Sequence, residues 1–243
     1  MLSKLQWQVQ DTIQSAQLSS MSCNILSILG ESAQEFNIID LCCGSANVLE
    51  YKLRLSHINS YTGIDIDSNA LQIARRRYPD YRFIHEDIFT IPLDNFIDSS
   101  AIVTCFSNTL LGLGQDRIKT WLRRLSDMNP QALLFAFTPE EKLDHIFRYA
   151  KWIAIENQDI PDLKVRVVYD KHSSTIDQFV LMNSRLGTFV NQHTIPIISI
   201  TNLKYFLREC GWDLVNWYDS CSLNAQSIDI SYCESLIYAK PIS

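Results

Sequence analysis

Three aspartates stand at the ends of predicted strands, where side chains can meet a ligand. Asp40 lies at the end of a short apolar strand, Asp65 ends the next one, and Asp87 comes just after the third. In open α/β sheets, ligands bind outside the carboxyl ends of the strands. A carboxylate at that edge can accept hydrogen bonds from the hydroxyl or amino groups of a ligand. The pattern therefore predicts a binding site for a small polar ligand.

The loop after the first strand is built from small residues. It contains Cys42, Cys43, Gly44 and Ala46 and leads into a helix. Small residues let a ligand approach the backbone closely, and the two adjacent cysteines are expected to point to opposite faces and pack as small side chains. Asp65 follows Gly44 by 21 residues, the usual position of a carboxylate that binds both hydroxyls of a ribose. The spacing therefore favours a ligand that contains a nucleoside.

Strands and helices must alternate to bring these residues together, and the sequence has this alternation. Strand patterns occur at 38–41, 61–66, 81–85, 101–106, 132–137, 214–218 and 232–239. Helical patterns occur at 48–55, 68–78, 115–128 and 201–210, and we expect Thr201 to cap the last of these. Strands spaced by helices predict βαβ units. The expected fold class is α/β, a Rossmann-like, doubly wound and mostly parallel seven-stranded sheet.

Two segments depart from this alternation and are expected to cover the site. Residues 1–30 have helical patterns, and residues 151–198 have strand patterns with few helix signals. We expect the second segment to form an inserted antiparallel ribbon, whose one apolar face must cover something. The whole chain, 1–243, is predicted to be a single domain in which these two segments roof a pocket at the strand ends.

The composition excludes several classes of protein. Of the 243 residues 47% are hydrophobic and the net charge is −6, so the chain can build a core and lacks the positive surplus of a generic nucleic-acid binder. The seven cysteines are scattered without a Cys-x-x-Cys pair, which fits a reducing compartment and gives no support to a zinc site. No apolar run reaches the about 20 residues of a membrane-spanning helix. We therefore expect a cytoplasmic protein with no membrane or nucleic-acid partner.

The pattern of strand, small-residue loop and later acids resembles the class I S-adenosylmethionine-dependent methyltransferases. That family has acid-x-Gly-x-Gly-x-Gly after its first strand. Here Asp40 is the acid and Gly44 the second glycine, while Cys42 and Ala46 replace the other two. If the loop keeps the path of the family, Cys42 is expected in a backbone region open to ordinary residues. The resemblance runs from about residue 37 onwards and leaves out 151–198.

The resemblance implies a cofactor and a role for each acid. S-adenosylmethionine is the implied cofactor and S-adenosylhomocysteine the product. Asp40 would lie beside the ammonium group of the cofactor, Asp65 would bind the ribose, and Asp87 would accept from the adenine amine. Ile88 would pack on the adenine ring. The other residues that we assign to the cofactor site are Cys42, Gly44, Ile66 and Phe106.

Two other functions fit parts of the same pattern. A dehydrogenase that uses a nicotinamide dinucleotide would need glycines where Cys42 and Asn47 stand, and it would give Asp87 no task. A binding module that keeps the cofactor site but no longer reacts would retain all of these residues. Both alternatives therefore stay open beside the methyltransferase.

The acceptor is predicted to be a small molecule, methylated at a nitrogen or oxygen atom, for example in specialised metabolism. The segment 107–110, after the fourth strand, lacks the prolines that enzymes methylating adenine amines in nucleic acids have there. No aspartate lies between 99 and 114, where magnesium-dependent relatives have one, so no metal is expected. The candidate substrate contacts are Asn108 and Tyr169, and the candidate catalytic bases are His172 and His193.

Overall fold

The computed structural model describes most of the chain between residues 36 and 242. The described residues are 36–49, 58–106, 110, 115–137, 139–142, 153–155, 163–170, 173, 175–184, 187–219 and 235–242. The predictions for residues 1–30, Asn108 and His172 lie outside these ranges, and for Tyr169 and His193 only the backbone is described.

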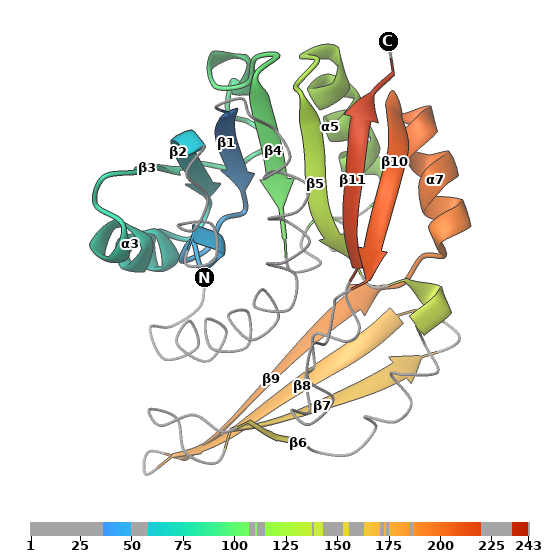
Figure 1. Cartoon of the computed structure of the whole chain (residues 1–243). Coiled ribbons are helices and arrows are strands. Elements are labelled where there is room, and N and C mark those ends of the chain that lie inside the picture. Colours follow the sequence, from blue (N-terminus) through green and yellow to red (C-terminus); the bar gives the residue numbers. More distant parts are fainter. Residues whose placement is uncertain are drawn as a thin grey trace.

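The main sheet has seven strands and is mostly parallel, as predicted. Its order is β10-β11-β5-β4-β1-β2-β3 (Figure 1), and only β11 runs antiparallel to its two neighbours. The chain leaves β1 towards β2 on one side and later returns to β4 on the other, which makes the end of β1 a topological switch point. The bounds are β1 Phe36–Leu41, β2 Ile58–Asp65, β3 Arg82–His85, β4 Ala101–Cys105, β5 Ala132–Phe137, β10 Trp212–Asp219 and β11 Ser235–Pro241.

The described helices are α3 Ser68–Arg77, α5 Gln115–Asp127 and α7 Ile200–Glu209, with short 3-10 turns at Leu93–Asn95 and Glu140–Lys142. Asp67 caps α3 because its carboxylate accepts from the N–H groups of Asn69 and Ala70. The predicted cap of α7 is wrong by two residues. Ser199, not Thr201, has the extended backbone of a cap and accepts from the N–H of Asn202. Ser199 and Thr201 are two residues apart, and the helical pattern alone does not decide which of them caps the helix.

Apolar side chains form a core on each face of the main sheet. Successive residues of β1 point to opposite faces, so Ile38 belongs to one core and Ile39 to the other. Helices α5 and α7 pack on the face of Ile39, and α3 packs on the face of Ile38. Trp212 is fully buried and its indole N–H donates to the carbonyl of Leu122 in α5. The two layers of helix fix the positions of the strand ends between them.

The strands between 153 and 196 form a second, antiparallel sheet, as predicted. Its strands β6 Ile153–Ile155, β7 Leu163–Asp170, β8 Thr175–Ser184 and β9 Gly187–Pro196 are paired in chain order, and all pairs are antiparallel. In Figure 1 this sheet lies beyond the carboxyl ends of β4 and β5, where their arrowheads are drawn. It is therefore on the side of the molecule where the parallel strands end. Among the described residues, no helix combines the length and the apolar character needed to cross a membrane.

Candidate functional site

The loop after β1 turns sharply by placing alternate residues in the left-handed region. The φ angles are +54° at Cys42, +55° at Gly44 and +59° at Ala46. The expectation that Cys42 adopts an ordinary backbone region is therefore wrong. Positive φ costs a non-glycine residue about 1–2 kcal/mol, so this loop keeps the path that glycine favours although two of the three positions have a side chain. The hydrogen bond from the Ala46 N–H to the carbonyl of Cys43 closes the turn.

The two adjacent cysteines fill space on opposite sides of this loop, as predicted. Cys42 packs against the core on the α5 side, and Cys43 packs against the core on the α3 side. Burial raises the pKa of the Cys43 thiol well above its usual range, and the neighbouring Asp40 adds to this effect. A thiol in that state is a poor nucleophile. The structure therefore supports packing as the role of Cys43.

Asp65 joins the loop to the end of β2. Its two carboxylate oxygens accept from the N–H groups of Gly44 and Asp67, both at 2.8 Å. Only 7% of the residue is exposed, and burial raises the pKa of its carboxyl, although the two backbone N–H groups act to lower it. The backbone carbonyl of Asp65 accepts from the N–H of Glu86, after β3. Asp65 thus links the ends of β1, β2 and β3.

Asp40 is buried deeper than Asp65 and is contacted from both neighbouring strands. The hydroxyl of Tyr61 in β2 donates to one carboxylate oxygen at 2.6 Å, and the hydroxyl of Thr104 in β4 donates to the other at 2.5 Å. Only 2% of Asp40 is exposed. Tyr61 and Thr104 were not singled out from the sequence. A doubly wound sheet puts β1 between β2 and β4, but it does not fix which residues of those strands face Asp40.

The segment after β3 carries the third acid. Asp87 is half-buried, and its carboxylate accepts from the N–H of Phe89 at 2.9 Å. Ile88 is 4% exposed and belongs to the core under α5, where its carbonyl accepts from the indole N–H of Trp121. Ile66, by contrast, is 63% exposed directly after β2. Ile88 is therefore part of the core, whereas Ile66 is exposed to solvent beside the site.

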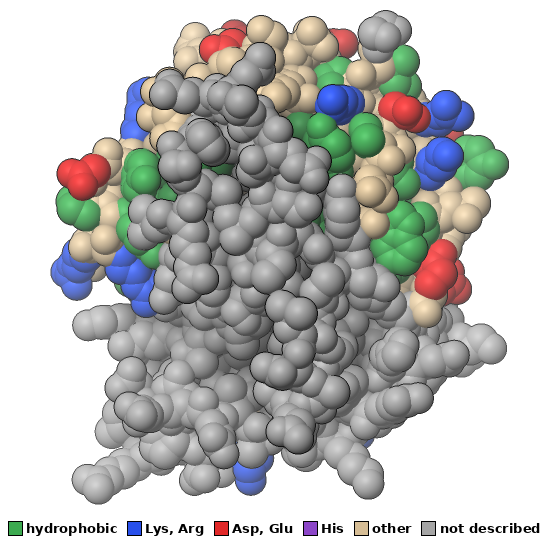
Figure 2. All heavy atoms as spheres, in the orientation of Figure 1, with side chains coloured by type: hydrophobic (Ala, Val, Ile, Leu, Met, Phe, Trp, Pro, Cys, Tyr) green, Lys and Arg blue, Asp and Glu red, His purple; other side chains and the backbone are tan. Residues whose placement is uncertain are grey.

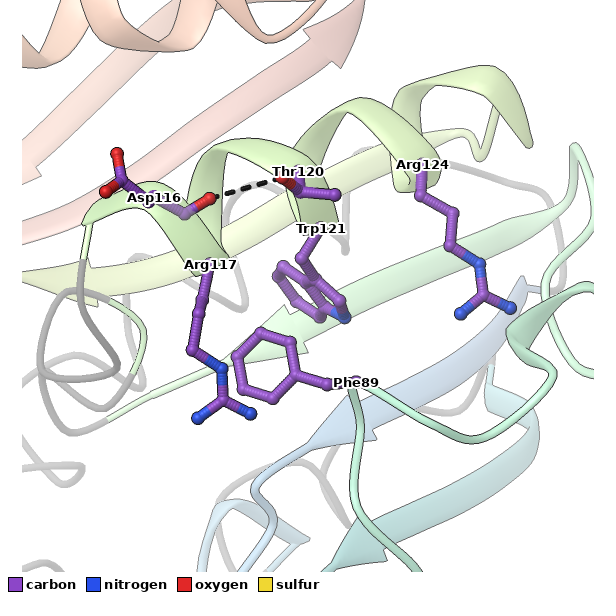
Figure 3. A pocket seen from close by; sticks show the side chains of 6 residues that line it. All are labelled: Phe89, Asp116, Arg117, Thr120, Trp121 and Arg124. Carbon is purple, nitrogen blue, oxygen red and sulfur yellow. Dashed lines mark hydrogen bonds between the residues drawn. The ribbon is translucent and has the colours of Figure 1, made fainter.

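A pocket of about 420 Å³ adjoins this segment on the α5 side (Figure 3). The guanidinium of Arg117 lies 4.0 Å from the centre of the Phe89 ring, and the guanidinium of Arg124 lies 3.1 Å from the carboxylate of Asp94. None of the predicted site residues lines this pocket. Its lining is Phe89, Asp116, Arg117, Thr120, Trp121 and Arg124. The sequence predicted only the helix at 115–128, which carries all of these residues except Phe89.

Five of the predicted residues come together in the described structure. Asp40, Cys42 and Gly44 follow one another at the end of β1, Asp65 is bonded to Gly44, and Phe106 directly follows β4 beside β1. Phe106 is 6% exposed and packs in the core on the α3 side.

Of the predicted acceptor residues, the structure describes only the backbones of Tyr169 and His193. The backbone of Tyr169 lies in β7 and that of His193 in β9, the two strands that flank β8. Among the described residues, no group of three or more His, Cys, Asp or Glu side chains is placed to hold a metal ion. The described site therefore consists of carboxylates, the hydroxyls of Tyr61 and Thr104, backbone groups and apolar side chains.

These features define a doubly wound α/β protein with a carboxylate-lined site at the switch point of its sheet. Residues 38–129 match the family model of a methyltransferase domain. The match covers less than half of the chain, and it agrees with the predicted family and enzyme class. The match favours a methyltransferase over the dehydrogenase that the sequence left open. A comparison with curated protein sequences gives no match.

Several solved structures that share this fold are methyltransferases by name. The S-adenosylmethionine-dependent methyltransferase from Clostridium acetobutylicum ATCC 824 has a TM-score of 0.69 at 13% identity, over 93% of this chain and 92% of its own. The CcbJ methyltransferase from Streptomyces caelestis has a TM-score of 0.67 at 14% identity, over 94% and 90%. The sugar N-methyltransferase KedS8 from Streptoalloteichus sp ATCC 53650 has a TM-score of 0.65 at 12% identity, over 93% and 88%. The similarity covers nearly the whole chain and confirms the predicted fold.

Proposed function

We propose that the protein transfers the methyl group of S-adenosylmethionine to a nitrogen or oxygen atom of a small-molecule acceptor. The observation that carries the proposal is the link between Asp65 and Gly44, which joins an acid at the end of β2 to the loop after β1. Among the described residues, each oxygen of Asp65 accepts one hydrogen bond. A carboxylate oxygen can accept about two, so both oxygens keep capacity for the two hydroxyls of a ribose.

The other proposed cofactor contacts lie at the same edge of the sheet. Asp87 is half-buried after β3, one strand farther out than Asp65, which suits the adenine amine at the next position along the edge. Ile66 offers an exposed apolar side chain for the flat face of a base. The methyl donor supplies an activated methyl group, and the protein must align the acceptor with it and exclude water.

The acceptor is proposed to bind between this edge and the second sheet. Support comes from the position of that sheet beyond the ends of β4 and β5 (Figure 1) and from the relative KedS8, whose acceptor is a sugar nitrogen. On the face drawn in Figure 2, acidic and basic side chains are interspersed over the described surface. With a net charge of −6, such a surface suits a small acceptor better than a nucleic acid.

Titration calorimetry with S-adenosylhomocysteine and with NAD tests the cofactor. We expect S-adenosylhomocysteine to bind and NAD not to bind. Asp65→Ala should weaken S-adenosylhomocysteine binding about a hundredfold, because two hydrogen bonds to a charged group each contribute about 1.5–3 kcal/mol. Asp98→Ala is the matched control, since Asp98 is exposed before the first residue of β4, at the opposite edge of the sheet. Binding of NAD without S-adenosylhomocysteine would reverse the proposal.

The role of the second sheet is tested with acceptor-side variants. Tyr169→Phe and His193→Gln are expected to raise the KM of an amino-sugar acceptor or lower kcat at least several-fold. Their Kd for S-adenosylhomocysteine should stay within about twofold, because general-base and positioning roles act on the acceptor alone. Equal losses of cofactor and acceptor binding would show that the sheet only stabilises the fold.

A further inference from the structure

A buried carboxylate is held from both sides at the switch point of the sheet. Asp40 pairs with Thr104 across β1 and β4 and with Gly63 across β1 and β2. Tyr61 comes two residues before Gly63, so its side chain lies on the same face as Asp40 and reaches it along β2. The result is one hydroxyl donor for each carboxylate oxygen.

Packing fixes the phenol of Tyr61 in this position. Its ring makes edge contacts with the rings of Tyr81 and Phe83, at centroid distances of 5.5 and 5.9 Å. Gly63 leaves the space that this arrangement needs, because a Cβ there would lie 2.7 Å from the sulfur of Cys43 and 2.9 Å from the Phe83 ring. Burial and the nearby carboxylate raise the pKa of Tyr61 well above its usual range. Tyr61 therefore stays a neutral hydrogen-bond donor.

Among the residues that the structure describes, Asp40 takes part in no salt bridge. Buried charges are usually paired or bind a metal, because removing an isolated ion from water is costly. Two hydroxyl groups satisfy the oxygens of Asp40 as acceptors but bring no positive charge. A cation that arrives with a ligand would complete the pairing.

We propose that Tyr61 and Thr104 are positioning residues that orient Asp40, so that its negative charge stabilises the ammonium group of the cofactor's amino acid. The inference rests on the proposed function, since it needs a cofactor with that group. The hydroxyls hold the carboxylate in one orientation before the ligand binds, and a group that is already oriented loses less entropy on binding. An alternative role is purely structural: the two hydrogen bonds would tie β2 and β4 to β1 without affecting any ligand.

Two ligands separate these roles. S-adenosylhomocysteine carries the amino acid, whereas 5′-methylthioadenosine has the same nucleoside and sulfur but no ammonium group. Titration calorimetry with both is carried out on the full chain and on the variants Thr104→Val and Tyr61→Phe, which remove one hydroxyl each and keep the shape. We expect each variant to raise the Kd of S-adenosylhomocysteine about tenfold, as the loss of about 1.4 kcal/mol predicts. The Kd of 5′-methylthioadenosine should change less than about twofold.

Two further variants serve as controls. Thr104→Ser restores the hydroxyl and should recover most of the affinity for S-adenosylhomocysteine. Thr62→Val removes a buried hydroxyl from β2 on the opposite face from Tyr61, and both Kd values should remain those of the wild type. Thermal melts verify that each variant is folded, and Tyr61→Phe decides the question if Thr104→Val does not fold.

Three results would overturn the inference. Equal weakening of both ligands would mean that the hydroxyls act on the fold or on the whole site. Unchanged binding of S-adenosylhomocysteine in both variants would mean that the orientation of Asp40 does not matter to the ligand. A wild-type protein that binds no S-adenosylhomocysteine would refute the proposed function and this inference with it, whereas the first two results leave the proposed function intact.

Discussion

The loss of the Asp65 carboxylate should destabilise the protein even without a ligand. Asp65→Ala leaves the N–H groups of Gly44 and Asp67 without their 2.8 Å acceptors in a site where Asp65 is only 7% exposed. Each buried donor left unsatisfied costs about 1–3 kcal/mol. Relief of the carboxylate's own desolvation offsets part of this loss. We therefore expect the free energy of unfolding to fall by about 2 kcal/mol.

Thermal denaturation of the ligand-free protein measures this effect. For a domain of 243 residues, a loss of about 2 kcal/mol corresponds to a fall in Tm of about 4–8 °C. Urea denaturation should show the same loss with an unchanged m-value. If Asp65→Ala melts at the temperature of the wild type, the two hydrogen bonds do not hold the loop in solution. Contacts other than these two hydrogen bonds would then hold the loop to the end of β2.

The pH dependence of stability provides an independent test of the role of Asp65. Because burial raises the pKa of Asp65 in the folded protein, the folded state binds this proton more tightly than the unfolded state does. The contribution of Asp65 to stability is then largest below its unfolded pKa of about 3.9 and falls as pH rises towards the folded value. Asp65→Asn does not titrate, so the stability of the wild type relative to this variant should decrease as pH rises above about 4. An increase over this range would contradict the raised pKa.

Three smaller predictions concern the elements around the site. The φ angle of Cys42 is +54°, a conformation that glycine adopts without the cost that other residues have. In urea denaturation, Cys42→Gly should therefore be more stable than Cys42→Ala by about 1 kcal/mol. The opposite order would show that the turn changes its backbone conformation in the variants. Gly63→Ala should lower Tm and weaken S-adenosylhomocysteine binding, since its Cβ would lie 2.9 Å from the Phe83 ring, and a wild-type melting curve would mean that the ring moves aside easily. Asp67→Ala should cost about 1 kcal/mol of unfolding free energy through the lost cap of α3, and no change in a urea titration would show that water replaces the cap.

The sheet could be predicted from the sequence because its strands are short, apolar and separated by helices. The run at 132–137, for example, is buried at every residue and could hardly be anything but a central strand. Boundaries were less certain, as the α7 cap shows, because Ser199 and Thr201 are both good caps. The pattern also indicated the antiparallel ribbon, because residues 151–198 have strand patterns with few helix signals.

The cofactor side of the site was predictable in part. The spacing of Gly44 and Asp65 indicated that they act together, and the structure joins them by a hydrogen bond. The positive φ at Cys42 was not predictable from residue type, since the fold imposes a conformation that cysteine disfavours. Tyr61 and Thr104 escaped notice because hydroxyls in strand interiors usually signal only strand propensity. Their contact with Asp40 depends on the register of three strands, which no local pattern contains.

The place of β11 has a consequence for the synthesis of the chain. β11 follows β10 in sequence but lies between β5 and β10, and β10 meets the sheet only through it. While the ribosome is still making 235–241, β10 therefore has no strand to pair with. The free edge of β5, with the apolar sequence ALLFAF, exposes unpaired backbone groups during this interval, and such edges pair readily with other chains. A nascent chain that pauses between β10 and β11 thus exposes an apolar edge that can pair with other chains until β11 is complete.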